Sequence, residues 1–157
     1  MGILTFGSCS HGRHLLVKVW GLLTNPMNET EALMRAYFDA FNHHDIEGML
    51  ATLSTDVAHD INEGGREVGI EAFRAFKTHM DACYREQIRD MVFMTYGNHG
   101  TTEFIVDGEY IGTDDGLPEA TGQRYSIPAA AIFEVTSGKI SRVTSYYNLR
   151  AWLTAIS

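Results

Sequence analysis

From residue 28 onward, the first half of the chain carries apolar residues at helical spacing. From residue 28 to 42 they recur three and four positions apart, which predicts a helix with one buried face. Asp45 stands where it can cap a second, short helix, and a third helix is predicted to begin near Gly69. A short strand is predicted over residues 57–62, between the second and third helices.

The second half of the chain changes to a period of about two residues, which is typical of strands. Four strands are predicted, over residues 87–96, 101–112, 123–135 and 139–149. The turns GNHG and TSG join neighbouring strands, and the segment TDDGLPEATG forms a loop. Helices followed by antiparallel strands predict an α+β fold, in which the helices cover one face of a curved sheet and leave a cavity at its open end.

Composition and charge narrow the class of protein. The chain has 157 residues, 45% hydrophobic and 20% charged, as expected for one globular domain. Residues 27–157 are predicted to form this domain, and residues 1–26 an N-terminal extension. A net charge of −8 without a Lys or Arg cluster argues against a nucleic-acid partner, and no apolar run is long enough to span a membrane. Cys9 and Cys83 are interpreted as free thiols, which predicts a reducing, cytoplasmic location.

Polar residues interrupt the short strand in the segment DVAHDINEGGREVGIEAF, residues 56–73. Alternation places His59 on the same face as Val57 and Ile61, and places Asp60 and Asn62 on the other face. We therefore expect His59 to be the more buried of the two titratable neighbours. It is either a hydrogen-bonded core histidine or an acid–base group in a pocket, because its ordinary pKa lies near neutrality. Asp60 is either an exposed carboxylate or a pocket residue.

Further candidates for a ligand site come from a helix and the later strands. Tyr37 lies on the apolar stripe of the first helix, where it is a core residue or a pocket hydroxyl. Tyr146 and Asn148 share one face of the last strand and are expected to point into the cavity or at a dimer partner. Glu103 is an inward carboxylate or part of a solvated strand face, and Tyr125 is also expected to contact the ligand.

Four segments of the sequence resemble one known superfamily. They are YFDAFNHHDIEGMLATL, DVAHDI, GIEAFRAF and IFEVTSGKISRVTSYYNL. Together they are similar to the NTF2-like superfamily, in its SnoaL-like and ketosteroid-isomerase-related branch, from about residue 28 to the C-terminus. The resemblance implies a cone in which about three N-terminal helices pack on a strongly curved mixed or antiparallel sheet that encloses a cavity. The fold alone does not define an activity, since it hosts many.

The resemblance to ketosteroid isomerases also implies site residues. Tyr37 matches a tyrosine that holds the oxyanion, and the general-base aspartate falls at Asp60 or at Ile61, depending on the end from which residues are counted. A slip of one residue moves a side chain to the other face of the sheet. The second acid of such sites is a protonated aspartate, and its position is held here by Ala131. Steroid isomerisation by that mechanism therefore lacks one donor.

The limonene-epoxide-hydrolase relatives imply a different set of residues. Their last-strand aspartate matches Asn148, their middle-strand pair falls near Thr101 and Glu103, and no arginine is evident. Asn148 cannot donate a carboxylic proton, so this mechanism is incomplete as well.

The leading hypothesis is a small acid–base enzyme, an isomerase, cyclase or hydratase, that binds an apolar small molecule in the cavity. His59 or Asp60 moves a proton, Tyr37 hydrogen-bonds the oxyanion, and no cofactor is required. The alternatives are a non-catalytic binding or dimeric interaction module of the same fold, and an epoxide-hydrolase-like enzyme.

Two expectations concern metals and partners. No metal site is predicted, because His43 and His44 are adjacent in a turn and no HxxxH or CxxC spacing exists. A homodimer is expected through the open sheet face, which Phe133, Tyr146 and Tyr147 are expected to form.

Overall fold

The computed structural model of the protein describes residues 29–157. Four helices and one six-stranded sheet make up this part of the chain. In chain order the elements are α2 (Glu29–Asn42), α3 (Ile46–Thr52), β1 (Leu53–Asp60), β2 (Arg66–Val68), α4 (Ile70–Cys83), β3 (Tyr84–Tyr96), β4 (His99–Tyr110), β5 (Gln123–Thr136), β6 (Lys139–Tyr147) and α5 (Leu149–Ile156). The extension expected at residues 1–26 lies outside the described residues.

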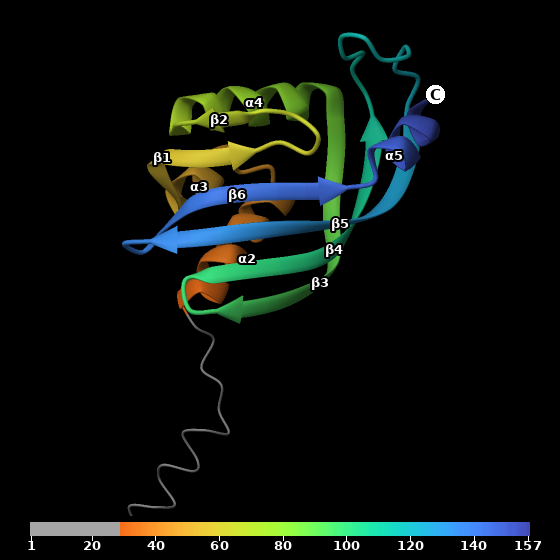
Figure 1. Ribbon diagram of the computed structural model, residues 1–157. Helices are drawn as coiled ribbons and strands as arrows, with labels where there is room; N and C mark the ends of the chain where they lie inside the picture. The colour runs from red at the N-terminus through yellow and green to blue at the C-terminus, as the bar shows by residue number, and fades with distance from the viewer. Residues whose placement is uncertain (1–28) are drawn as a thin grey trace, which may run out of the picture.

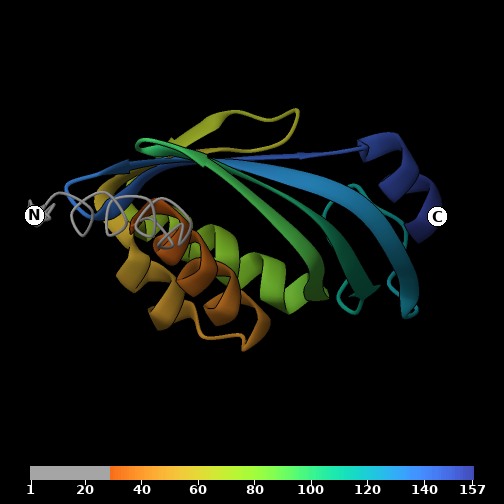
Figure 2. The same ribbon diagram turned by 90° about the horizontal axis from the view of Figure 1, so that it is seen from below.

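The strands follow the order β2-β1-β6-β5-β4-β3 across the sheet. β1 and β6 run parallel, and the other neighbours are antiparallel, so the sheet is mixed. Figure 1 shows the sheet face on, and Figure 2 shows α2, α3 and α4 on one side of a sheet that curves toward them. The predicted α+β cone is therefore confirmed.

The curvature has a visible local cause in β3. The register between β3 and β4 shifts between Arg89 and Val92, and Asp90 in this bulge has a φ of 55°. A bulge bends its strand and strengthens the twist. On the side of the bulge where β3 begins, β3, β4 and β5 curve down past the helices, and α5 lies at that end of the sheet (Figure 2). The bend leaves the helices unable to cover the whole concave face.

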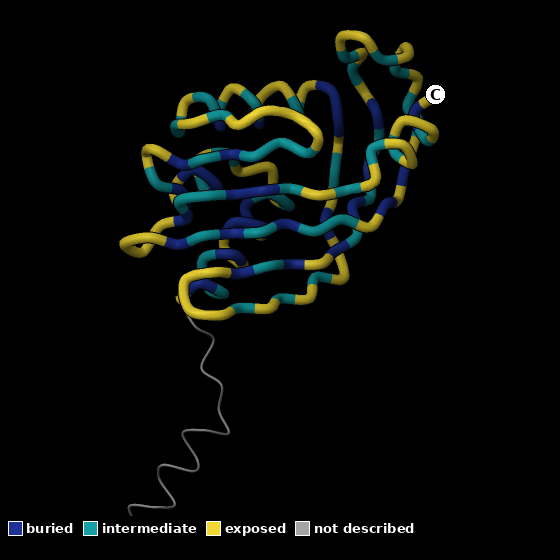
Figure 3. Tube along the Cα trace, viewed as in Figure 1, coloured by how far each residue is buried: buried dark blue, intermediate teal, exposed yellow. Residues whose placement is uncertain are grey.

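The core lies between the concave face and the helices, where buried positions are concentrated in the central strands (Figure 3). Its centre is aromatic: the Phe133 ring, with no exposed surface, lies 5.4 Å from Tyr37 and 5.6 Å from Phe38, edge to face. Such pairs add about 0.5–1.5 kcal/mol to the area they bury. They attach α2 to the middle of the sheet.

Two elements of the structure could not be predicted from the hydrophobic pattern of the sequence. β2 has only three residues and pairs with β1 along the sheet edge, too short for alternation to show. α5 begins where the last strand was expected to continue, because the Asn148 side chain accepts a hydrogen bond from the Ala151 amide and caps a helix. The strand therefore ends at Tyr147 rather than Leu149.

The expected dimer surface is wrong at Phe133, which lies on β5 and is buried in the core. Tyr146 is 51% exposed, and Tyr147 is half-buried and lines both the internal cavity and a depression on the outer face. The homodimer stays a prediction.

The cytoplasmic location stays a prediction. Within residues 29–157, Cys83 is a buried free cysteine, while Cys9 lies outside the described part, so the cytoplasmic location rests on composition alone. None of the helices described is long and apolar enough to cross a membrane.

Replacing Phe133 with Ala should cost about 3–5 kcal/mol of unfolding free energy, because the truncated ring leaves a cavity at the centre of the core. Chemical denaturation would measure the loss. The matched control is Val92→Thr, since Val92 is 54% exposed on β3 and its replacement keeps a β-branched side chain. The control should stay within about 0.5 kcal/mol of the wild type. Equal losses in the two variants would contradict this description of the core.

Candidate active site

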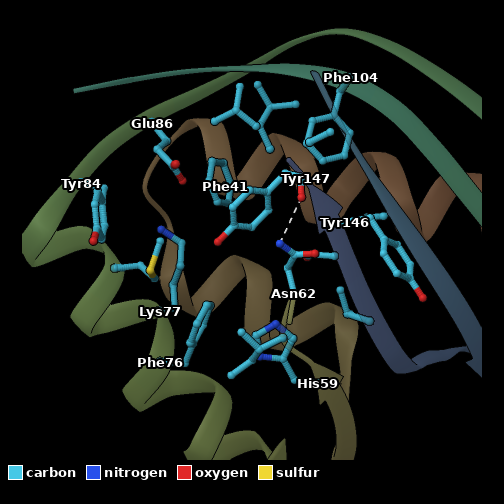
Figure 4. A pocket seen from close by; sticks show the side chains of 18 of the residues that line it. Phe41, His59, Asn62, Phe76, Lys77, Tyr84, Glu86, Phe104, Tyr146 and Tyr147 are labelled. Carbon is cyan, nitrogen blue, oxygen red and sulfur yellow. Dashed lines mark hydrogen bonds between the residues drawn. The ribbon is translucent and has the colours of Figure 1, made fainter. Parts of the chain in front are cut away.

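A cavity of about 290 Å³ lies between α2, α4 and the concave face of the sheet. Its walls are mostly apolar and aromatic, and Figure 4 shows Phe41, Phe76, Phe104 and Tyr147 around it. This volume is close to the lower end of the range for small-molecule pockets, roughly 300–1,000 Å³. The walls suit a compact apolar molecule, and the few polar groups among them decide the chemistry.

His59 enters the cavity from β1. It is 4% exposed and its ring lies 4.5 Å from Phe76 and 5.0 Å from Phe73, centre to centre. Its Nδ1 atom is buried without a hydrogen-bond partner among the described residues. Burial lowers the pKa of His59 to about 4, and the negative charge of nearby Asp60 opposes this only in part. The imidazole is therefore neutral at neutral pH.

Asp60 lies on the opposite, outer face of the sheet. Its carboxylate accepts hydrogen bonds from Arg66, at 2.6 and 3.0 Å, and from the Thr144 hydroxyl at 3.0 Å. Hydrogen bonding to Arg66 is the largest cause that lowers the pKa of this carboxyl. The structure therefore separates the two candidate bases: His59 lines the cavity and Asp60 does not.

Tyr37 reaches the cavity from α2, and Asn62 reaches it just after β1 ends. The Tyr37 hydroxyl makes no hydrogen bond to any described residue, and burial raises its pKa, so it keeps its proton and can donate a hydrogen bond to a ligand. The Asn62 amide donates to the Tyr147 carbonyl at 3.1 Å, which ties the end of β1 to β6 (Figure 4).

The sequence interpretation missed a polar cluster at the other end of the cavity. Lys77 and Asp81 of α4 form an ion pair, and Glu86 of β3 lies beside them (Figure 4). Tyr125 was expected to contact the ligand, but its hydroxyl donates to Glu86 Oε1 at 2.6 Å, and its ring does not line the cavity. Signals for the cluster did exist in the sequence. Lys77 lies on the apolar stripe of its helix, and Glu86 alternates with two apolar residues.

The remaining candidates lie away from the cavity or at its rim. Glu103 and Thr101 face outward from β4, because the alternate residues of that strand fill the core. Asn148 caps α5. Tyr146 lies at the rim with its hydroxyl turned away from the interior (Figure 4), and Ala131 lines the cavity without adding a polar group.

One group of possible metal ligands occurs among residues 29–157, namely His79, Cys83 and Asp114, whose ligand atoms lie within 4.8 Å of one another. His79 Nε2 and the Tyr84 hydroxyl each lie 2.9 Å from an Asp114 oxygen. Burial raises the pKa of Cys83, which favours the thiol over the thiolate that binds metals. Hydrogen bonds therefore account for this group, and the absence of a metal site stays a prediction.

Comparisons with known proteins identify the family and the fold. The SnoaL-like domain family matches residues 34–143. A proposed polyketide cyclase from Xanthomonas campestris pv. campestris is 46% identical, with a TM-score of 0.81 and coverage of 82% of this chain and 97% of that one. Another from Pseudomonas putida KT2440 is 47% identical, with a TM-score of 0.80 and coverage of 83% and 99%.

More distant similarity reaches an LEH-like epoxide hydrolase of M. tuberculosis, at 16% identity and a TM-score of 0.65, covering 82% of this chain and 89% of that one. At this identity the similarity shows the fold alone. None of the curated proteins matches the chain significantly. The matched domain covers most of the chain and the solved structures share its fold, so the chain belongs to the SnoaL-like family of NTF2-like proteins.

Proposed function

We propose that this protein is an enzyme that moves a proton on an apolar, carbonyl-bearing small molecule, with His59 as its acid–base group. The observation that carries the proposal is the state of this imidazole. It is neutral, it faces an apolar cavity, and its Nδ1 has no partner among the described residues. Buried polar atoms are almost always hydrogen-bonded, and those that are not call for an explanation. The ring of His59 also lines the cavity, so a functional role for the imidazole is the explanation that we propose.

The relatives support the class of substrate. Two solved structures that share nearly half of their residues with this chain are proposed polyketide cyclases. Polyketides carry carbonyl groups at short intervals, and the carbon between two carbonyls holds an acidic proton. Cyclisation of such a chain begins with the loss of that proton, which a neutral imidazole can accept.

The chemistry needs only the groups described. His59 takes a proton from the carbon beside a carbonyl, and the electron pair of the broken C–H bond becomes an enolate. Tyr37 lines the same cavity and donates a hydrogen bond to the enolate oxygen. In an isomerisation the proton returns to another carbon. In a cyclisation the enolate carbon attacks a second carbonyl, a C–C bond forms, and the proton passes to the new alkoxide.

Asp60 acts from outside the cavity in this proposal. Its negative charge favours the protonated form of His59, as its effect on the pKa of the imidazole shows. The charge stabilises the imidazolium that forms when the proton arrives. Because Arg66 and Thr144 hold the carboxylate on the outer face, Asp60 touches no substrate and is a positioning residue.

A non-catalytic binding module is the second candidate, and one observation favours it. Ala131 and Asn148 stand where the two enzyme patterns carry acids, and neither brings a polar side chain into the cavity. An epoxide-hydrolase mechanism has less support, because Thr101 and Glu103 lie on the outer face.

The wild type should speed the exchange of α-protons of 2-tetralone, an apolar bicyclic ketone, for deuterium in D2O, followed by NMR. The variant His59→Gln should lower this acceleration about 10²–10⁴-fold, because it removes the proton acceptor. Affinity for 2-tetralone should change by no more than about threefold, since shape and apolar contacts remain. The control His99→Gln changes an exposed histidine of β4 and should behave as the wild type. If the wild type binds 2-tetralone without accelerating the exchange, the non-catalytic binding module remains as the function.

The low pKa of His59 predicts a stability difference between wild type and His59→Gln that depends on pH. An unfolded chain binds the imidazole proton near pH 6.5, and the folded chain only near pH 4. The stability of the wild type is therefore fully present above about pH 6.5 and falls as pH drops to about 4, by about 3 kcal/mol more than that of the variant. Urea denaturation at a series of pH values measures both. Parallel curves would show that His59 is not held neutral.

We further propose that two copies pair through the outer face of the sheet. Met94 and Tyr146 are about half exposed there, and with Pro128 they line one shallow depression. Sedimentation at micromolar concentration should show a dimer, and Tyr146→Glu should shift it to a monomer because a charge would be buried in the contact. Val68→Glu, at the far edge of the sheet, should leave the dimer intact. A monomeric wild type would overturn the proposal.

A further inference from the structure

We propose that Glu86 is a neutral carboxylic acid that donates a hydrogen bond, from the end of the cavity away from His59, to a carbonyl oxygen of the substrate. The inference deepens the proposed function and rests on it for the identity of the reaction. It assigns the acid partner that the sequence lacks at Ala131, and it places that acid on a different strand. Three independent features of the structure carry it.

The first feature is a contact built across three strands. Glu86 on β3 lies opposite Gly108 on β4, and Gly108 lies opposite Tyr125 on β5. The Tyr125 ring crosses over Gly108, where an added Cβ would come within 2.1 Å of its Cζ atom. Only because this position has no side chain can the Tyr125 hydroxyl reach Glu86 Oε1, at 2.6 Å. The strands therefore hold one carboxyl oxygen and leave the other for a ligand.

The second feature is the count of charges in the cluster. Lys77 is 4% exposed, and its ammonium is paired with Asp81 and lies 4.6 Å from the centre of the Phe41 ring. One cation thus faces two carboxyl groups and is already neutralised by one of them. A second negative charge at the half-buried Glu86 would have no counter-ion of its own, which is costly in an apolar site. The arrangement favours a proton on Glu86.

The third feature is the balance of effects on the acid itself. Burial is the largest effect and raises the pKa of Glu86, while the Tyr125 hydrogen bond and the charge of Lys77 lower it less. The carboxyl therefore stays protonated to higher pH than an exposed glutamate. The groups that act on it are Lys77 and Asp81 from α4, Tyr125 of β5 and Tyr147 of β6, and Tyr84 and Asp114 line the same cavity.

These features define what the acid can do. A protonated carboxyl has one donor, and here its carbonyl oxygen is occupied by Tyr125. The O–H of Glu86 is left for the cavity that the residue lines (Figure 4). A carbonyl oxygen placed there accepts the hydrogen bond, and the bond strengthens when negative charge develops on that oxygen. The site therefore selects apolar molecules with a carbonyl group over hydrocarbons of the same shape.

Two probes of equal shape test this selection. 2-Acetylnaphthalene carries a carbonyl group, and 2-isopropenylnaphthalene has a CH2 group in place of that oxygen. Isothermal titration from about pH 5 to about pH 10 would measure both affinities. His59 is mainly neutral over this range, because burial lowers its pKa to about 4. The wild type should prefer the ketone about tenfold at pH 5, since one hydrogen bond is worth about 1.4 kcal/mol, and should lose the preference as pH rises and Glu86 ionises.

Substitutions identify the group responsible. Glu86→Gln keeps a neutral donor of the same size, so its ketone preference should persist across the whole pH range. Glu86→Leu has no donor and should show no preference at any pH. Glu103→Gln, on the outer face, is the matched control and should follow the wild type. The wild-type pH profile alone decides the question if a variant fails to fold. A wild-type preference that is absent, or that does not change with pH, overturns the inference.

The outcome can be separated from that of the proposed function. If 2-tetralone exchange depends on His59 but the ketone preference does not depend on Glu86, the enzyme proposal stands and this inference fails. If the ketone preference follows Glu86 and no exchange is seen, the hydrogen bond is supported and the catalytic proposal fails. His59→Gln should keep the ketone preference, because it leaves the acid end of the cavity unchanged.

Discussion

The pairing of β1 between β2 and β6 is the constraint on which the candidate site depends. Asp60 lies opposite Arg66 on one neighbouring strand and Thr144 on the other, and its carboxylate binds both side chains on the outer face. A slip of one residue would break these bonds and turn His59 outward, because side chains alternate between faces. The hydrogen bonds of Asp60 with Arg66 and Thr144 thus determine that an imidazole, and not a carboxylate, enters the cavity.

The position of the His59 imidazole in the cavity has an energetic consequence for the whole domain. An imidazole among phenylalanine rings is stable only in its neutral form, and its Nδ1 is buried without a protein partner among residues 29–157. An unsatisfied buried polar atom costs about 1–3 kcal/mol. The aromatic core around Phe133 and the long antiparallel ladders offset such a cost.

The sequence was sufficient for the fold and for half of the site. Helical and strand periods located the main elements, and simple alternation made His59 the more buried neighbour, as its 4% exposure confirms. Periodicity could not tell whether the last strand continues or a helix begins, because Asn148 fits both a strand face and a helix cap. It could not find the Glu86 cluster either. Alternation shows that Glu86 faces inward, but only the bend of the sheet decides whether inward means core or cavity.

Ala131 and Glu86 show why a family resemblance carries the fold further than the chemistry. Position along the chain matched Ala131 to an acid, yet at that place on β5 the cavity wall is a methyl group. The acid comes instead from β3, two strands away across β4, and it is held by a tyrosine that passes over a glycine. A donor that enters from another strand meets the substrate from another direction. A substrate that binds between Glu86 and His59 therefore has a different orientation from one bound between His59 and an acid at position 131. Matching single positions along the chain to a relative does not predict this orientation.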